Sequence, residues 1–330
     1  MQITVLDGHT LNPGDNPWTA IESLGTLTVH PRTAPHDILS RAQGAAVLLT
    51  NKTRLDETTL AALPDLAFIG VLATGYDVVD VTAAAKRGIP VSNVPGYGTN
   101  AVAQHVFAML LELCRRVTEH SQSVLRGQWS NATDWCYWNS TQQELTGKTM
   151  GLVGFGNISH RVGEIATAFG MRVQAYAPRP KQHPGWTGFR FCDREELFAT
   201  SDVISLHCPL TPENKGFVNA DLLSRTRPGA ILINTARGPL VDEQAVADAL
   251  HSGKLGGLCT DVTAVEPVPM DSPLITAPNC LITPHLAWGT LTARRTLMDI
   301  TARNIAAFQA GKPQNVVNAR LLHPTGIPSK

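Results

Sequence analysis

The sequence lacks the close cysteine and histidine spacings that indicate zinc ligation or a redox dithiol. Its six cysteines are scattered without a Cys-x-x-Cys pair, and its eleven histidines form no His-x-x-x-His or Glu-x-x-His run. Such sites need ligands at short, regular spacings. We therefore expect no metal site, and we interpret the cysteines as reduced, mostly buried thiols of a cytoplasmic protein.

The sequence also lacks an excess of charge of either sign, and it lacks long apolar runs. The chain carries 27 basic and 27 acidic residues and no basic run, which argues against a nucleic-acid surface. The most apolar helix candidate, Ala101 to Leu113, is too short to span a bilayer. The first residues, Met1 to Asp7, lack the profile of a signal peptide and read as a strand. These features predict a soluble protein with neither nucleic acid nor membrane as a partner.

The chain does contain a regular alternation of short apolar runs and helical stretches over 330 residues. That alternation is typical of parallel sheets with crossover helices, and the length allows two domains. We expect an α/β protein with two doubly wound parallel-sheet domains, in which a Rossmann-type nucleotide domain is inserted into a discontinuous flavodoxin-like substrate domain. The expected substrate (catalytic) domain covers 1–99 plus 289–330, and the dinucleotide-binding domain covers 100–288.

The expected elements follow the same pattern. A long helix should run from about Asn100, its N-cap, to Arg126, and another from about Thr290 to Ala310. The tail Lys312–Lys330 should return to the first domain. The expected strands are Ile3–Leu6, Ala46–Thr50, Phe68–Leu72, a brief one within Gly88–Asn93, Met150–Gly154, Arg172–Tyr176, Val203–Leu206, Ala230–Asn234, Gly257–Asp261 and Cys280–Thr283.

An aromatic segment interrupts this alternation. Residues Gly127–Glu144 hold Trp129, Trp135, Tyr137 and Trp138 among polar residues, without helical or strand period. We interpret an arm of about 120–145 as a contact surface with a second subunit, which predicts a homodimer. A loop folded onto its own core is the alternative.

The strand at Met150 runs into Gly-x-Gly-x-x-Ser at the start of a helix. Gly154 would make the tight turn, and Gly156 would let the backbone approach a pyrophosphate at the helix N-terminus. Ser159 replaces the third glycine and is still small enough for close helix–strand packing. A lone Gly-x-Gly is a weak signal, but the strands on either side strengthen it. We therefore expect a dinucleotide cofactor.

The end of the second strand of this unit bears on the choice of cofactor. A carboxylate there would accept hydrogen bonds from the ribose diol of NAD, whereas this chain has Ala177-Pro178-Arg179-Pro180-Lys181. The missing carboxylate and the cations Arg179 and Lys181 favour NADP, or use of both NAD and NADP. The alternative is an ordinary solvated turn beside bound NAD.

Three residues in the second half carry the chemistry. Arg237, Glu266 and His285 each follow an apolar run, where a parallel sheet presents side chains at its strand ends. Arg can hold the carboxylate of a 2-oxo acid, His can give a proton to the new alkoxide, and Glu can keep that His charged. Each residue alone could be structural, as an ion pair, a surface turn or a core histidine. Together, downstream of the glycine loop, they predict catalysis.

Taken together, these motifs resemble the D-isomer-specific 2-hydroxyacid dehydrogenases, and within them the glycerate dehydrogenase/hydroxypyruvate reductase branch. The resemblance covers nearly the whole chain. The matching stretches are Leu6–Asp15, Thr50–Thr53, Ala73–Asp77, Asn93–Thr99, Val102–His105, Ser205–Pro212, Asn234–Gly238 and Pro284–Trp288.

The resemblance implies roles for individual residues. Arg237 would bind the substrate carboxylate and carbonyl, His285 would be the general acid/base, and Glu266 would hydrogen-bond to His285. Trp138 would come from a partner subunit. Apart from the resemblance, Trp288, three residues past His285, could wall a small substrate pocket, with core packing as the alternative. Lys52 could attract anions near the mouth of the cleft, with an ordinary solvated loop as the alternative. Backbone N–H groups around Ala73, Thr74 and Gly75 would cradle the carboxylate. The implied cofactor-binding residues are Gly154, Gly156, Asn157, Ile158, Ala177, Arg179, His207, Pro209, Thr235, Ala236 and Asp261, the last near the nicotinamide amide.

The resemblance also implies an activity. We expect an NAD(P)-dependent dehydrogenase that reduces hydroxypyruvate and glyoxylate to D-glycerate and glycolate. The same chemistry on another 2-oxo acid or on phosphite is one alternative. A nucleotide-sensing, corepressor-like binding protein is another, although no basic patch or interaction tail supports it.

Overall fold

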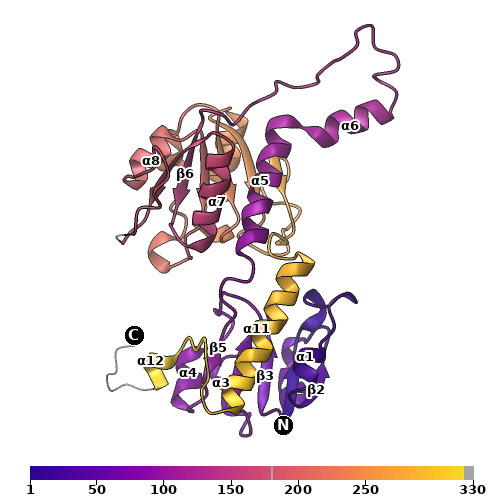
Figure 1. The fold of residues 1–330 in the computed structure, drawn as a ribbon, viewed down its shortest axis with the longest axis vertical. Coiled ribbons are helices and arrows are strands. Elements are labelled where there is room, and N and C mark those ends of the chain that lie inside the picture. Colours follow the sequence, from indigo (N-terminus) through magenta and orange to yellow (C-terminus); the bar gives the residue numbers. More distant parts are fainter. Residues whose placement is uncertain (180, 323–330) are drawn as a thin grey trace. The chain divides into compact units, whose positions relative to one another are not determined.

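A computed structural model describes residues 1–179 and 181–322. The chain forms two compact units, one of Met1–Gly98 with Gly289–Lys330 and one of Thr99–Trp288; both are drawn in Figure 1. Pro180 and the end of the expected 312–330 tail, residues 323–330, lie outside the described residues. Within the described residues, no helix is both long and apolar enough to cross a membrane.

The first unit contains a parallel five-stranded sheet in the order β2-β1-β3-β4-β5. This order is the flavodoxin-like one. Its strands are β1 (Gln2–Val5), β2 (Thr26–Val29), β3 (Val47–Thr50), β4 (Phe68–Val71) and β5 (Val91–Ser92). Its helices are α1 (Thr19–Glu22), α2 (Ile38–Ala42), α3 (Glu57–Ala61), α4 (Val81–Lys86), α11 (Leu291–Gln309) and α12 (Ala319–Leu322).

Helices cover both faces of this sheet because successive strand residues point to opposite sides. On β3, Val47 and Leu49 join a cluster that includes Leu297 and Ile305 of α11. Leu48 joins the other cluster, which includes residues of α2, α3 and α4. Helix α11 begins after Thr290, whose hydroxyl accepts a hydrogen bond from the Ala293 N–H. The last helices of the chain therefore complete the core that the first strands begin.

The second unit contains a parallel seven-stranded sheet in the order β12-β11-β10-β9-β6-β7-β8. The order is that of a Rossmann sheet with one added strand, so the expected fold class is confirmed. Its strands are β6 (Thr149–Val153), β7 (Arg172–Tyr176), β8 (Arg190–Phe191), β9 (Val203–Leu206), β10 (Ala230–Asn234), β11 (Leu255–Thr260) and β12 (Cys280–Ile282). Its helices are α5 (Thr99–Arg115), α6 (Val117–Leu125), α7 (Asn157–Ala168), α8 (Arg194–Thr200), α9 (Ala220–Ser224) and α10 (Glu243–His251).

The long helix expected from Asn100 to Arg126 is wrong as a single element. The structure has two helices, α5 and α6, which meet at Arg116 (Figure 1). Arg116 adopts a left-handed conformation (φ 45°, ψ 47°), which a continuous helix does not allow. The Glu112 carboxylate accepts the Thr118 N–H, and the Arg116 guanidinium donates to Asn279. These two side-chain bonds, the second to a residue far along the chain, compensate for the backbone bonds lost at the break. Helix α5 also begins one residue before the expected cap Asn100.

The aromatic segment of the second unit follows α6 as an extended stretch without helix or strand between residues 126 and 145. Figure 1 shows this stretch and α6 reaching away from the seven-stranded body of the unit. Trp129, Trp135 and Trp138 are 53%, 85% and 70% exposed. Tyr137 instead turns inward and shares a 2.6 Å hydrogen bond with Ser123. The segment is therefore not folded onto the core of its own unit.

The cysteines are less buried than expected. All six are free; Cys114 and Cys259 are buried, and the other four are partly buried. Burial still raises the pKa of the Cys192 and Cys208 thiols to about 11. These side chains are therefore neutral thiols near pH 7.

Candidate active site

Arg237, Glu266 and His285 follow the carboxyl ends of three neighbouring strands. Arg237 comes after β10, Glu266 after β11 and His285 after β12. The strand ends are in register, since Asn234 pairs with Thr260, and Thr260 with Ile282. Parallel strands present their carboxyl ends at one edge of the sheet, where α/β proteins bind ligands. The three candidate catalytic residues thus come from adjacent loops of the second unit.

The turn that carries Arg237 lies directly against the loop that carries Glu266. Asn234 fixes the turn: its amide donates to the Arg237 carbonyl over 2.9 Å and accepts the Ala236 N–H over 3.1 Å. A side chain at Gly238 would meet the Thr263 backbone at 2.0 Å. Only glycine permits this approach. The sequence analysis does not identify Gly238, because nothing in the neighbouring residues predicts contact with the backbone of Thr263.

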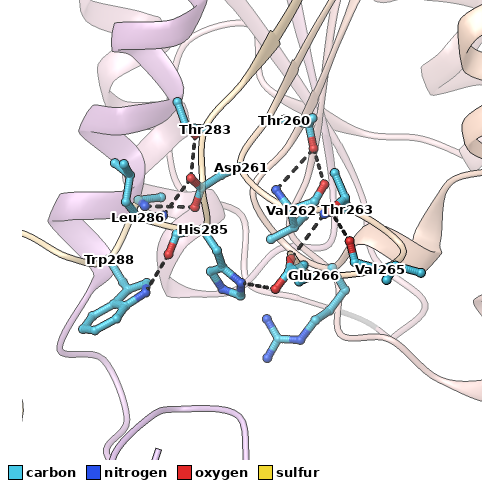
Figure 2. A network of polar contacts seen from close by, with 12 residues as sticks. Thr260, Asp261, Val262, Thr263, Val265, Glu266, Thr283, His285, Leu286 and Trp288 are labelled. Atoms are coloured by element: carbon cyan, nitrogen blue, oxygen red, sulfur yellow. Dashed lines mark hydrogen bonds and ion pairs between the residues drawn. The ribbon is translucent and has the colours of Figure 1, made fainter. Parts of the chain in front are cut away.

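Glu266 and His285 form the central contact of the site (Figure 2). The His285 Nδ1 lies 2.7 Å from one Glu266 carboxylate oxygen, and the other oxygen accepts the Thr263 N–H over 3.2 Å. The His285 and Glu266 side chains are 27% and 38% exposed, so the pair remains accessible. A carboxylate on Nδ1 orients the ring and leaves its Nε2 available for proton transfer.

Asp261 holds the loop that bears His285. This carboxylate is buried and accepts the backbone N–H groups of Leu286 and Ala287, each over 2.9 Å (Figure 2). It also accepts the Thr283 hydroxyl over 2.6 Å. His285 sits between these partners in a left-handed conformation with φ 52°, which a non-glycine residue adopts only when its surroundings enforce it. The bonds of Asp261 therefore set the backbone from which the His285 ring projects.

His105 of α5 extends the same network. Its Nε2 lies 3.0 Å from the Thr283 hydroxyl and 3.7 Å from the Asp261 carboxylate. Trp288 adds a further contact, because its indole N–H donates to the His285 carbonyl over 2.9 Å. The structure thus brings together Asp261, Glu266, His285 and Trp288, and His105 joins them from a helix far away in sequence.

The glycine loop has the backbone that a dinucleotide needs. Gly154 has φ 91°, and a side chain there would meet the Cys208 N–H at 2.9 Å. Gly156 has open space where a side chain would stand, and it precedes α7 without any side-chain cap. Asn157 and Ile158 form the first turn of α7, whose N–H groups have no helical partner. This arrangement fits an anionic diphosphate.

Two buried hydroxyls also fit a bound cofactor. The Ser159 and Thr235 oxygens have no hydrogen-bond partner within the part of the chain that the structure describes. A buried hydroxyl without a partner is costly, so such groups usually meet a ligand or water. Thr235 lies in the turn between Asn234 and Arg237, on the same edge of the sheet as the glycine loop.

The other predicted cofactor residues lie around the ends of β7, β9 and β10. His207 directly follows β9 and shares a 2.9 Å hydrogen bond with the Ser205 hydroxyl. Burial lowers the pKa of His207 to about 4, so its ring is neutral near pH 7. Ala177 and Ala236 are half-buried, whereas Arg179 and Pro209 are exposed.

The predicted substrate residues Lys52, Ala73, Thr74 and Gly75 belong to the first unit. Lys52 is exposed in the loop after β3, and the other three follow β4. Ala73 and Gly75 are half-buried and Thr74 is exposed. Trp138 is exposed in the aromatic segment of the second unit. Their roles toward a substrate stay predictions.

Comparison with known proteins gives a consistent assignment. Residues 107–287 match the family model of the D-isomer specific 2-hydroxyacid dehydrogenase, NAD binding domain. The chain is 45% identical over 321 residues to a hydroxypyruvate reductase of Blautia hydrogenotrophica, covering 96% of this chain and 100% of the relative. It is 41% identical over 288 residues to a glycerate dehydrogenase of Methylorubrum extorquens, covering 86% of this chain and 89% of the relative.

Solved structures show the same architecture. An acyclic imino acid reductase, solved in complex with NADPH and D-Arg, is 31% identical and superposes with a TM-score of 0.83. The match covers 96% of this chain and 100% of that chain. The likeness therefore extends over both units.

Proposed function

This chain belongs to the D-isomer specific 2-hydroxyacid dehydrogenases, a family of nicotinamide-dependent oxidoreductases, and from that premise we propose that it reduces hydroxypyruvate and glyoxylate to D-glycerate and glycolate. The names of the two similar relatives, a hydroxypyruvate reductase and a glycerate dehydrogenase, support this substrate class. The observation that carries the proposal is the 2.7 Å contact between His285 and Glu266 at the edge of the nucleotide sheet.

His285 acts as the general acid in the reduction and as the general base in the reverse direction. A nicotinamide cofactor, when bound, supplies the hydride. As negative charge grows on the substrate oxygen, a protonated His285 ring donates its Nε2 proton to that oxygen, while Glu266 stabilises the ring through Nδ1. Glu266 thus keeps the ring in the orientation that the proton transfer needs.

Arg237 binds the carboxylate of the 2-oxo acid. Its guanidinium offers the paired N–H donors that fit a carboxylate, and its turn is fixed by Asn234. Within the first unit, the backbone N–H groups of Ala73, Thr74 and Gly75 are the proposed donors to a substrate carboxylate. Trp288 and Lys52 complete the substrate-binding residues.

A nicotinamide cofactor would bind at the glycine loop of the second unit, with NADP, or use of both NADP and NAD, favoured over NAD alone. The turn after β7 offers Ala177 where an NAD-binding site would have a carboxylate, and Arg179 is exposed there. Asp261 would lie near the nicotinamide amide of a bound cofactor, and His207 and Pro209 would border its adenine. The NADPH bound to the imino acid reductase is consistent with this preference.

The protein works as a cytoplasmic homodimer, without nucleic acid or membrane as a partner. The exposed tryptophans of the aromatic segment support a second subunit as the occupant of that surface. Trp138 of one subunit would then border the active site of the other. The balanced charge, 27 basic against 27 acidic residues, gives no attraction to a polyanion.

Steady-state kinetics test the proposal. Hydroxypyruvate, glyoxylate, pyruvate and a bulkier 2-oxo acid are each assayed with NADH and NADPH, and phosphite is assayed with both oxidised cofactors. We expect the highest kcat/KM with hydroxypyruvate, and His285→Ala should lower kcat by roughly a thousandfold while NAD(P)H binding persists. Ala177→Asp should shift the preference toward NADH. The proposal is wrong if no 2-oxo acid is turned over, or if His285→Ala keeps full activity.

A further inference from the structure

The loop after β4 shows an unusual pattern of hydrogen bonds. Each of its three successive carbonyl groups accepts one. The Leu72 carbonyl receives the Asn51 amide over 2.7 Å, and the Thr74 carbonyl receives the Asn93 amide, also over 2.7 Å. Between them, the Ala73 carbonyl receives the Val94 N–H over 3.0 Å.

These bonds also set the direction of three N–H groups. A trans peptide is planar, so each carbonyl points opposite to the N–H of the following residue. Fixing the carbonyls of residues 72, 73 and 74 therefore fixes the N–H groups of Ala73, Thr74 and Gly75. No acceptor for these three donors lies within residues 1–179 and 181–322. The loop thus presents a row of oriented donors, as an anion-binding backbone does.

Asn51 is itself held in place. Its side chain is buried, and its backbone N–H donates to the Asp7 carboxylate over 2.7 Å. The same carboxylate accepts the N–H groups of Lys52 and Thr53, over 2.5 and 2.7 Å. Asp7, at the end of β1, thereby anchors the loop after β3 that delivers the Asn51 amide.

Asn93 is anchored from the other side. Its backbone N–H donates to the Asn315 carbonyl over 3.1 Å, and its own carbonyl accepts the Asn304 amide over 2.9 Å. The Thr74 hydroxyl donates to the Val94 carbonyl over 2.8 Å, which ties the same two loops together. Two loops and α11 therefore converge on the loop after β4.

We propose that Asn51 and Asn93 are positioning residues whose amides orient the Ala73–Gly75 backbone as a cradle for the carboxylate of the substrate. The inference rests on the proposed function, in which this backbone binds a 2-oxo acid. Neither asparagine touches the substrate. Each acts through the peptide unit whose carbonyl it binds, Asn51 on the Ala73 N–H and Asn93 on the Gly75 N–H.

Isosteric substitutions test the inference. Asn51→Asp and Asn93→Asp replace a donor with a carboxylate that repels the same carbonyl. We expect KM for hydroxypyruvate to rise about tenfold in each variant, as loss of one well-placed hydrogen bond to a charged group implies. The dissociation constant of NADPH, followed by its fluorescence, should stay within about twofold, because the change removes substrate binding only.

Asn16→Asp is the matched control. Asn16 is a buried asparagine of the same unit whose amide donates to the Leu11 carbonyl over 3.0 Å, away from the loop after β4. It should lower the melting temperature as much as the other two variants while leaving KM unchanged. If the Asp variants do not fold, Asn51→Ser and Asn93→Ser replace them, because they remove the side-chain amide donor without adding charge.

The outcomes separate this inference from the proposed function. Turnover of hydroxypyruvate by the wild type with unchanged KM in the Asn51 and Asn93 variants overturns the inference alone. If the wild type reduces no 2-oxo acid, the proposed function fails, and calorimetric binding of oxalate to the NADPH complex decides the inference. Weaker oxalate binding in the two variants, but not in Asn16→Asp, supports it. Equal binding in all proteins, or no binding to the wild type, overturns it.

Discussion

Asp261 shows how much of the site depends on one side chain that need not take part in chemistry. Its carboxylate accepts two N–H groups and one hydroxyl from the segment around His285. Hydrogen bonds to a buried, charged acceptor are stronger than those between neutral groups. They offset the cost of the left-handed backbone at His285.

Asp261→Asn should therefore affect both stability and catalysis. In the variant, an amide NH2 replaces one acceptor oxygen and faces a backbone N–H group, so two donors meet. We expect the free energy of unfolding to fall by about 2 kcal/mol and kcat to fall by at least about tenfold. Asp202→Asn is the control, since Asp202 also accepts a backbone N–H, that of Thr149 over 2.7 Å. Urea unfolding and kcat should separate them: a similar loss of stability with unchanged kcat in Asp202→Asn is expected. An unchanged kcat in Asp261→Asn would contradict the role given to its bonds.

His207 makes stability depend on pH. Its pKa is about 4 in the folded protein against 6.5 ordinarily, because burial disfavours the charged ring. Between these values the unfolded chain binds the proton and the folded chain does not. The stabilisation is thus complete above pH 6.5 and is lost as pH falls toward 4.

For the wild type, this single group should lower the free energy of unfolding by about 2 kcal/mol between pH 7 and pH 5. In His207→Gln, that part of the slope should vanish. Urea unfolding of both proteins at the two pH values measures the difference. Equal slopes would show that His207 takes up its proton as readily in the folded protein as in the unfolded chain.

At the scale of elements, α7 is packed unusually closely against the segment that follows β7. Gly163 lies within α7, and a side chain there would meet the Trp186 ring at 2.3 Å. The Trp186 ring also lies 4.9 Å from the His160 ring and 6.1 Å from the Phe155 ring, between ring centres. Trp186 thereby packs its part of the segment after β7 against α7, the helix that begins at the glycine loop.

Gly163→Ala should reverse the usual effect of removing a helical glycine. In an ordinary helix the change stabilises by about 1 kcal/mol, but here the methyl group would displace Trp186 and should destabilise by about 1–3 kcal/mol. In a Trp186→Ala background the obstruction is gone, and the same change should stabilise. The measurement is thermal unfolding of four proteins: the wild type, the two single variants and the double variant. The packing argument fails if Gly163→Ala stabilises both backgrounds alike.

The elements that could be predicted from sequence are those with a strong local pattern. Strands at Val203–Leu206 and Ala230–Asn234 have the expected bounds because they are buried, mainly apolar runs. Arg172–Tyr176 also has the expected bounds, although Arg172 is exposed and Gln174 is polar. The edge strands β2 and β8 were not expected. Thr26–Val29 alternates between exposed and partly buried residues, and Arg190–Phe191 is too short to show a period. The break at Arg116 depends on Asn279, which no local pattern reveals.

For the whole molecule, the exposed tryptophans predict the state of assembly. The double change Trp135→Ser and Trp138→Ser should weaken the proposed dimer by at least about a hundredfold, because large aromatic side chains dominate interface energies. Sedimentation over a dilution series measures the dissociation. Met270→Ser is the control, as Met270 is an apolar side chain of the same unit, 81% exposed. A wild type that sediments as a monomer, or a double variant as tight as the wild type, would contradict the dimer.

The candidate site could be predicted only where residue type and position along the chain sufficed. Arg237, Glu266 and His285 were singled out because each follows a strand, and the structure joins Glu266 to His285. The supporting contacts could not be predicted. His105 reaches Thr283 from a helix 178 residues earlier in the chain, and Asn51 reaches Leu72 from a neighbouring loop. Such contacts arise from the packing of distant elements, which leaves no spacing rule in the sequence.

The discontinuity of the first unit has a consequence for how the protein is made. Residues 1–98 leave the ribosome well before α11, but Ile3, Val5 and Phe68 share their cluster with Leu297 and Ile305 of α11. Ser92 also pairs with Val316. Residues 99–288, a continuous stretch, can fold as soon as they emerge. Residues 1–98 must therefore wait, with one apolar sheet face uncovered, until α11 has been synthesised. During this interval their uncovered apolar face is a binding surface for a chaperone.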